Sequence, residues 1–263
     1  MKLFFKKIGD GKPLIILHGL FGMSDNWMTL ARQFSENGFA CYTVDLRNHG
    51  RSPHSDEFNY SIMADDLLTL MNDEQLASAD FIGHSMGGKV AMFVAALYPE
   101  KVNKLVVADI SARYYAPHHD GVLEALHSVD FDVIHSRKEA EEQIRISIHD
   151  EATVQFLLKN LYWKDRGIHE EKEEQQLAWR FNLSAIEKNI EAVGEALKES
   201  VVFARPTLFL RGERSGYITT KDELIIKKHF PKAQLKTIAG AGHWIHAEKP
   251  GEFLQVVCDF LKD

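Results

Sequence analysis

The sequence contains only two cysteines among its 263 residues, Cys41 and Cys258, and each stands among apolar neighbours. Two isolated cysteines provide neither the ligand spacing of a metal site nor the disulfide framework of a small secreted domain. We interpret both as small buried hydrophobic side chains, which is a common environment for a free cysteine. We therefore expect no metal site.

Long apolar runs are also missing from the sequence. A transmembrane helix needs about 18 or more consecutive apolar residues, and no such stretch occurs. The N-terminal residues MKLFFKKIGDGKP have neither the apolar stretch nor the small-residue cleavage site of a signal peptide. These absences predict a soluble, cytoplasmic protein with no membrane partner.

Basic residues are fewer than acidic residues. The 31 Lys and Arg residues against 38 Asp and Glu residues give a formal net charge of −7. A protein that binds a nucleic-acid duplex carries a basic stripe or patch. Here the basic residues are scattered, and pairs such as Lys6-Lys7 and Lys227-Lys228 stand alone. We expect no nucleic-acid partner.

The length of 263 residues and a hydrophobic fraction of 45% are typical of one large α/β domain. Short apolar, β-rich runs alternate with segments of helical periodicity. Strands that are buried on both faces and separated by helices predict a mainly parallel sheet. The apolar runs lie at residues 13–19, 39–50, 79–85, 103–111, 204–213 and 233–243, and a final helical pattern covers residues 250–263.

Residues 112–200 interrupt this alternation. They contain no convincing buried strand, and charge is dense in SRKEAEEQIR and IHEEKEEQQLAWRF. We interpret these pieces as amphipathic helices with solvated polar faces. The sequence thus predicts a core made of residues 1–111 and 201–263, with residues 112–200 as a helical insertion.

The motif GHSMG at residues 83–87 matches the pattern G-x-S-x-G, with an apolar strand before it and a helical pattern after it. A nucleophile elbow requires this context, since the serine occupies a strained turn that flanking glycines make possible. The N–H groups at the start of the helix favour developing negative charge. A glycine-rich turn without chemistry is the alternative, but the flanks favour Ser85 as a nucleophile.

Three further motifs accompany GHSMGG: HGLFG at 18–22, DLRNHGRS at 45–52 and GAGHWIHAEKP at 240–250. With these motifs the chain resembles the α/β-hydrolase fold proteins over nearly its whole length. Within them it resembles the YbfF-like bacterial esterases, a branch related to the ABHD11-type hydrolases. The resemblance implies a parallel sheet flanked by helices, an inserted lid, and hydrolysis of acyl esters or thioesters without a metal or an organic cofactor.

The serine needs a base within hydrogen-bond reach. His243 is the first candidate because it lies in a glycine-rich loop after a strand, late in the chain, as the order Ser, acid, His requires. His246 is the second candidate. We expect His84 to pack in the turn, since a neighbour of Ser85 on a sharp turn points elsewhere.

The sequence indicates less clearly which acidic residue would partner His243 in a Ser-His-acid triad. Many proteins of this fold carry it after the strand that here reads PTLFLRG, as G-x-x-D, but this chain has Ser215 at that position. Asp109 ends the strand NKLVVA and is our first choice, as the resemblance to the YbfF-like branch also implies. Its role would be to hold the His243 tautomer. A turn or helix-capping role for Asp109 is the alternative, and Glu213 is the second choice of acid.

Acyl transfer also needs two backbone N–H groups for the oxyanion. One is expected from Met86, and the family pattern points to Leu20 in HGLFG for the other. Phe21, and Trp179 of the lid, are candidates for substrate contact, although packing is an equal alternative for Phe21. We expect the loop DLRNHGRS to be a scaffold that Asp45 holds by hydrogen bonds.

These residues together predict a carboxylesterase- or thioesterase-type serine hydrolase, acting on short to medium acyl chains through an acyl-enzyme. Its partner would be a small-molecule acyl ester or thioester. Two alternatives remain on the same fold. One is a C–C bond hydrolase or lactonase, and the other is a non-catalytic receptor that keeps the pocket without turnover.

Overall fold

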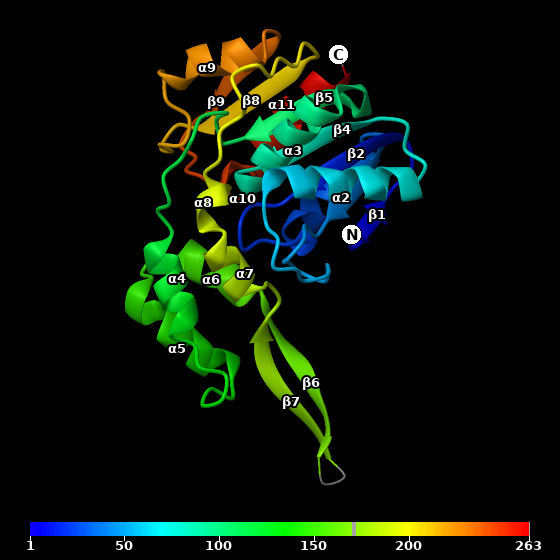
Figure 1. Cartoon of the computed structure of the whole chain (residues 1–263). Helices are drawn as coiled ribbons and strands as arrows, with labels where there is room; N and C mark the ends of the chain where they lie inside the picture. Colours follow the sequence, from blue (N-terminus) through cyan, green and yellow to red (C-terminus); the bar gives the residue numbers. More distant parts are fainter. Residues whose placement is uncertain (170–171, 263) are drawn as a thin grey trace.

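The computed structural model describes residues 1–169 and 172–262, and the side chains of all of these except 166–169 and 172–174. A seven-stranded sheet of order β1-β3-β2-β4-β5-β8-β9 forms the centre of the molecule (Figure 1). Every pairing in it is parallel except that of β1 with β3, which confirms the mainly parallel sheet. Its strands are β1 (Phe5–Ile8), β2 (Lys12–Leu17), β3 (Phe39–Val44), β4 (Ala79–His84), β5 (Val102–Ala108), β8 (Thr207–Gly212) and β9 (Ala233–Ile238).

Strand β1 is an addition to the predicted sheet. It has only four residues, FKKI, and pairs with β3 at the edge. An edge strand keeps one side towards solvent, so it needs no continuous apolar run. The two lysines of β1 interrupt the apolar pattern by which the other strands were predicted.

Helices cover both faces of the sheet, and each face has its own apolar core. Alternate residues of a strand point to opposite faces, so Ile15 and Leu17 belong to one core while Leu14 and Ile16 belong to the other. Helices α2, α3 and α9 lie on the first face, and α1 and α11 on the second (Figure 1). The helices of the core are α1 (Met28–Glu36), α2 (Tyr60–Asp73), α3 (Met86–Leu97), α9 (Asp222–His229), α10 (Ile245–Glu248) and α11 (Pro250–Lys262).

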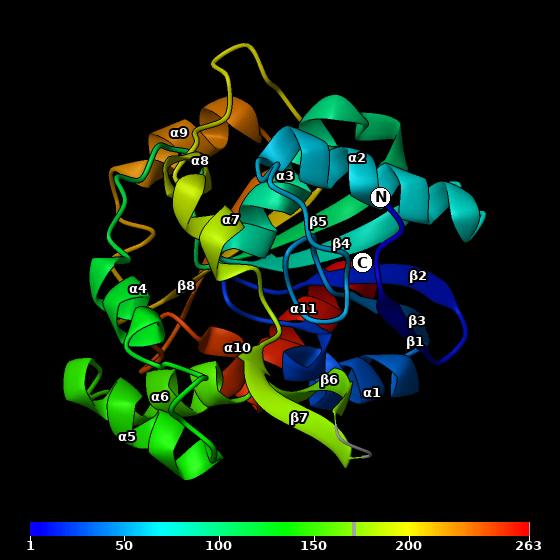
Figure 2. The same cartoon turned by 60° about the horizontal axis from the view of Figure 1, so that its bottom comes forward.

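The chain between β5 and β8 leaves the core and forms a separate layer over the carboxyl ends of the strands (Figures 1 and 2). Its described residues form five short helices, and also a two-stranded antiparallel sheet that the sequence did not predict. Its elements are α4 (Asp120–His127), α5 (Arg137–Ser147), α6 (Glu151–Leu158), β6 (Leu161–His169), β7 (Lys172–Trp179), α7 (Leu183–Lys188) and α8 (Ile190–Val193).

The segment IHEEKEEQQLAWRF was predicted to be an amphipathic helix, and that prediction is wrong. Most of it lies in β6 and β7, which project as a hairpin from the rest of the insertion (Figure 1). The residues that decide this are Leu177, Trp179 and Phe181, which are buried at every second position. This period of two is that of a strand, but three apolar residues behind a long charged run are a weak signal.

Lys89 of α3 fastens the insertion to the core. Its buried ammonium donates hydrogen bonds to the carbonyl oxygens of Arg113, 2.5 Å away, and Glu195, 2.7 Å away. These two residues lie where the chain enters and leaves the insertion. Burial lowers the pKa of Lys89 to about 7.

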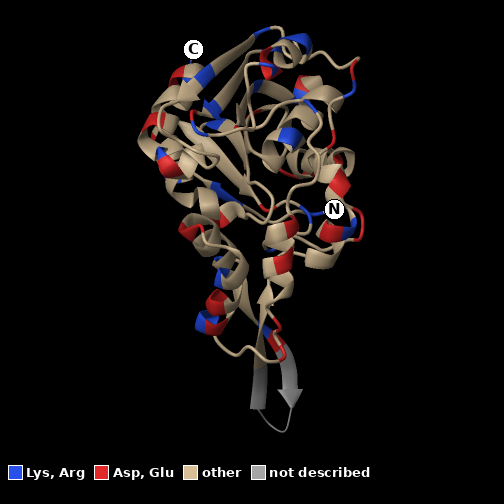
Figure 3. Ribbon diagram, turned by 90° about the vertical axis from the view of Figure 1, so that its left-hand side faces the viewer, with Lys and Arg blue, Asp and Glu red and all other residues tan. Residues whose placement is uncertain are grey.

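Charged residues of both signs are interspersed over the surface elements that Figure 3 shows. Among the described residues, no helix is both long and apolar enough to cross a membrane.

Candidate active site

Ser85 occupies the turn between β4 and α3, with a backbone φ of 53° and ψ of −121°. Such a positive φ is strained for a residue with a side chain. The turn is also crowded: a Cβ on Gly83 would lie 2.2 Å from the Gly87 carbonyl oxygen, and one on Gly87 would lie 2.5 Å from the His18 carbonyl oxygen. Both glycines are therefore required, and the turn has the strand–turn–helix context that the sequence predicts.

Asp109 is the residue after β5, and its carboxylate is fully buried. Three donors surround it. The Gly212 N–H donates to Oδ1 over 3.0 Å, His243 Nδ1 lies 2.7 Å from Oδ2, and the Ser215 hydroxyl also donates to Oδ2. A buried carboxylate is costly unless it is hydrogen-bonded, and these three donors meet that requirement. Ser215, which stands at the usual aspartate position, thus supports Asp109.

Glu213 has a different partner. Its Oε2 accepts a hydrogen bond of 2.7 Å from the Gly240 N–H, and the side chain is exposed. It therefore stabilises the loop after β9. The structure brings Asp109, and not Glu213, to the His243 ring.

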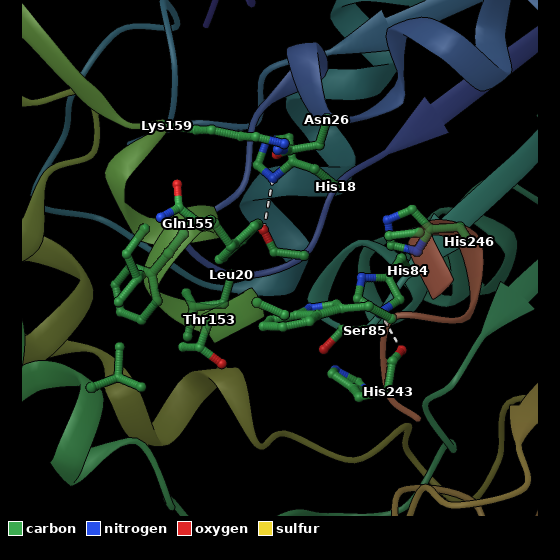
Figure 4. A pocket seen from close by; sticks show the side chains of 18 of the residues that line it. His18, Leu20, Asn26, His84, Ser85, Thr153, Gln155, Lys159, His243 and His246 are labelled. Atoms are coloured by element: carbon green, nitrogen blue, oxygen red, sulfur yellow. Dashed lines mark hydrogen bonds between the residues drawn. The ribbon is translucent and has the colours of Figure 1, made fainter. Parts of the chain in front are cut away.

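His243 faces the same cavity as Ser85, and the two side chains lie next to each other (Figure 4). Since Nδ1 donates to Asp109, Nε2 is left as a proton acceptor on the side of the serine. The Tyr217 ring stacks on the imidazole at a centroid distance of 4.0 Å. His243 is thereby held between a carboxylate and an aromatic ring.

Two other histidines near Ser85, His84 and His246, have different partners. His84 Nε2 is 2.9 Å from the His243 carbonyl oxygen, so His84 holds the backbone of the histidine loop (Figure 4). His246 stacks on Trp27 at 4.2 Å and is buried. The position next to Asp109 thus belongs to His243, and His246 packs against the core.

Leu20 and Met86, the expected oxyanion donors, come from two separate segments, the HGLFG turn and the start of α3. Met86 is the first residue of α3, so its N–H has no acceptor within the helix. Leu20 belongs to the turn of HGLFG, which the Gly22 N–H closes by a 2.9 Å hydrogen bond to the Gly19 carbonyl oxygen. Both residues line a small cavity together with Ser85.

Two side chains from elsewhere hold the HGLFG turn at Phe21, whose φ is 58°. The Phe21 N–H donates to His49 Nε2 over 3.1 Å, and the amide of Asn160 donates to the Phe21 carbonyl oxygen over 2.8 Å. His49 comes from DLRNHGRS, whereas Asn160 follows α6 of the insertion. No sequence pattern pointed to Asn160, because the contact spans 139 residues.

The loop DLRNHGRS is a scaffold, as the sequence suggested. Asp45 accepts hydrogen bonds from the N–H groups of Ser24, over 2.5 Å, and Arg51, over 2.9 Å. Among the described residues that line the two cavities at Ser85, none comes from 45–52. Its contribution to the site is to position the HGLFG turn.

The larger cavity at Ser85 has a volume of about 360 Å³. Phe21 lines it, together with Phe156 and Leu157 of α6. Trp179 is not among the described residues that line either cavity, and it packs between Phe131 and Phe181. The alternation along β7 turns Trp179 inwards, and this corrects the predicted substrate contact.

Buried histidines around the site, among them His18, His49 and His246, make stability sensitive to acid. Burial lowers the pKa of His18 to about 4 and the pKa values of His49 and His246 to about 3, from an ordinary 6.5. Each is neutral when folded, so its contribution is complete above pH 6.5 and is lost as the pH falls towards the folded value. Between about pH 7 and about pH 5 we expect each to cost about 2 kcal/mol of unfolding free energy. Urea unfolding at both pH values measures this loss.

The variant His246→Phe keeps a ring against Trp27 and removes one of these titrations. Its loss of stability on acidification is expected to be smaller than that of the wild type by about 2 kcal/mol. An unchanged loss would show that His246 is not one of the groups responsible.

Comparisons with known proteins agree with this geometry. Residues 12–250 match the family model described as the alpha/beta hydrolase fold. The chain is 37% identical to a protein named sn-1-specific diacylglycerol lipase ABHD11 from Danio rerio, over 97% of this chain and 80% of that protein. It is 35% identical to the esterase YbfF of Escherichia coli K12, over 97% and 94%. A solved structure described as a marine microorganism esterase is 43% identical, covers 98% of this chain and 99% of its own, and superposes with a TM-score of 0.92. The chain therefore belongs to the α/β-hydrolase family.

Proposed function

We propose that this protein is a serine hydrolase that cleaves carboxylic esters or thioesters of short to medium acyl chains through an acyl-enzyme. The observation that carries the proposal is the 2.7 Å contact between Asp109 and His243, with the free side of that imidazole facing the cavity of Ser85. The relatives named esterase and lipase support the same class of reaction.

In this mechanism Ser85 Oγ attacks the carbonyl carbon of the ester while Nε2 of His243 takes the hydroxyl proton. Asp109 holds the imidazole in the required tautomer and stabilises the imidazolium. The N–H groups of Leu20 and Met86 stabilise the oxyanion of the tetrahedral intermediate. His243 then gives the proton to the leaving alcohol or thiol, and a water molecule releases the acyl group by the same steps.

We propose residues 112–200 as the lid of this site. The insertion lies over the carboxyl ends of the core strands, and its α6 contributes Phe156 and Leu157 to the larger cavity. An apolar cover excludes water from the reacting groups and strengthens the electrostatic interactions among them. The cytoplasmic location and the lack of a nucleic-acid partner stay predictions from the sequence.

The remaining alternatives have less support. Solved structures of an enol-lactonase and of a homoserine-lactone degrading enzyme match the whole chain, but at 18% identity they show the fold alone. The relatives at 35% identity or more carry names of ester-cleaving enzymes.

The experiment that tests the proposal is turnover of p-nitrophenyl butyrate and of a butyryl thioester by the purified protein. A fluorophosphonate probe, which reacts with activated serines, provides a second measurement by mass spectrometry. We expect turnover and a single adduct on Ser85. A protein that neither turns over these substrates nor takes up the probe would contradict the proposal and favour a non-catalytic receptor.

The contact of Asn160 with Phe21 predicts that the lid helps to hold the oxyanion loop. The variant Asn160→Asp replaces the donating amide by a carboxylate, which repels the Phe21 carbonyl oxygen. A small displacement of a catalytic N–H is costly, so we expect kcat to fall roughly tenfold to hundredfold with KM almost unchanged. Steady-state kinetics on p-nitrophenyl butyrate measures both values.

The matched control is Asn189→Asp. Asn189 also lies in the insertion and donates to backbone carbonyl oxygens, those of Asp56 and Ala185, but neither acceptor belongs to the HGLFG turn. Equal losses in the two variants would show a general effect on the insertion and would contradict a specific role of Asn160.

A further inference from the structure

Two cavities meet at Ser85, and they differ greatly in size. The larger has a volume of about 360 Å³, and the smaller has about 30 Å³. Both include Ser85 and Leu20 in their walls. His243 and Trp244 line only the larger cavity, whereas Met86 and Ile110 line only the smaller one. The nucleophile therefore stands at a junction with a different set of groups on each side.

The stereochemistry of acyl transfer decides which part of an ester enters which cavity. The tetrahedral carbon carries Ser85 Oγ, the oxyanion, the acyl chain and the leaving oxygen. The leaving oxygen must face His243, because that imidazole gives it a proton. The acyl chain is attached on the side away from the imidazole. The alcohol thus belongs in the cavity that His243 lines, and the acyl chain belongs in the smaller cavity.

The smaller cavity is short of space. A water-sized group needs about 10 to 15 Å³ of such volume, so the cavity takes two or three of them. Its wall formed by α8 is tied down, because the Tyr60 hydroxyl donates to the Val193 carbonyl oxygen over 2.5 Å. Next to it, the Tyr115 N–H donates to the Gly194 carbonyl oxygen over 2.9 Å, and a Cβ on Gly194 would lie 1.8 Å from the Tyr115 carbonyl oxygen. These contacts hold the wall of the smaller cavity in place.

We propose that this smaller cavity is the acyl subsite and that it makes the enzyme prefer esters of very short acids, acetyl and propionyl, with larger alcohols or thiols, over esters of longer acids. The proposal rests on the serine hydrolase function above and narrows its substrate class. In the acylation step the bond between Ser85 Oγ and the carbonyl carbon forms and the bond to the leaving oxygen or sulfur breaks. The proton passes from Ser85 through His243 to the leaving group, which departs into the larger cavity. Water enters by the same route and releases the short acid.

The test is a series of p-nitrophenyl esters from acetate to octanoate, with each kcat/KM divided by the alkaline hydrolysis rate of that ester. We expect the highest value at acetate or propionate and a fall of about tenfold or more at hexanoate, since an overfilled, tightly packed site is strongly destabilised. A flat profile, or one that rises with chain length, would overturn the assignment.

Two matched substitutions distinguish the cavities. Val193 lines only the smaller cavity, and Val122 of α4 lines only the larger one. Val193→Ala is expected to raise the hexanoate-to-acetate ratio of kcat/KM by about tenfold, because the substitution removes two carbon atoms from the wall of the smaller cavity. Val122→Ala should leave this ratio unchanged. Ile190→Ala, on the same wall as Val193, is the second variant if Val193→Ala does not fold.

The outcomes separate this inference from the function on which it rests. If Val122→Ala shifts the chain-length profile and Val193→Ala does not, the acyl chain lies in the larger cavity and the inference is wrong, while the serine hydrolase function stands. If no ester of any length is turned over and no serine adduct forms, the proposed function fails and the inference fails with it.

Discussion

Replacing Ser85 by alanine is expected to abolish ester hydrolysis, with a fall in kcat of about ten-thousandfold to millionfold. The substitution removes the only atom that forms the acyl-enzyme. It keeps the fold, because alanine fits a turn whose crowding falls on Gly83 and Gly87. The measurement is the hydrolysis of p-nitrophenyl butyrate by wild type and variant, with circular dichroism to show that both are folded.

Ser184→Ala is the matched control for this prediction. Ser184 is an exposed residue of α7 in the insertion and lines neither cavity among the described residues. Its activity should equal that of the wild type. If Ser85→Ala retained turnover and the fluorophosphonate adduct appeared on another residue, Ser85 would not be the nucleophile.

Asp109→Asn is expected to lower kcat by about ten-thousandfold. The Asp109 carboxylate accepts hydrogen bonds from three groups: the Gly212 N–H, the Ser215 hydroxyl and the Nδ1–H of His243. An asparagine side chain has one accepting oxygen, so its amide nitrogen must face at least one of these donors. His243 then loses its partner or takes the wrong tautomer. Steady-state kinetics with a neutral ester measures the loss.

Glu213→Gln provides the comparison that decides the identity of the acid. A glutamine oxygen can still accept the hydrogen bond from the Gly240 N–H, so we expect kcat to stay within about threefold of the wild-type value. If the losses were reversed, with Glu213→Gln inactive and Asp109→Asn nearly normal, Glu213 would be the acid.

The position of Asp109 has a simple topological basis. Strands β5 and β8 are parallel neighbours, with Ala108 opposite Leu210. Residues that follow the two strands therefore emerge side by side at the same edge of the sheet. A carboxylate after either strand can reach a histidine on the loop after β9. This chain has its carboxylate after β5 and a serine hydroxyl after β8 that donates to it.

Much of the molecule could be predicted from the sequence because the relevant signals are local. Buried parallel strands are continuous apolar runs, and the nucleophile turn needs its glycines within two residues of Ser85. Those patterns predicted the sheet and the position of Ser85, and the resemblance carried by the four motifs implied the fold family. Asp109 and His243 required one further rule, the order of elements in the fold, because they lie far from Ser85 along the chain.

Other features depend on contacts that no local pattern contains, and only the tertiary structure decided them. The many charged residues of β6 and β7 obscure the strand pattern in the sequence. Only the burial of Leu177, Trp179 and Phe181 shows which face of the hairpin packs against the rest of the insertion. Asn160 reaches Phe21 across 139 residues of chain. The smaller of the two cavities at Ser85 lies where α8 contacts α2, through the hydrogen bond between the Tyr60 hydroxyl and the Val193 carbonyl oxygen. The local sequence pattern thus predicted the nucleophile, whereas the space left for a substrate is set by how distant segments pack together.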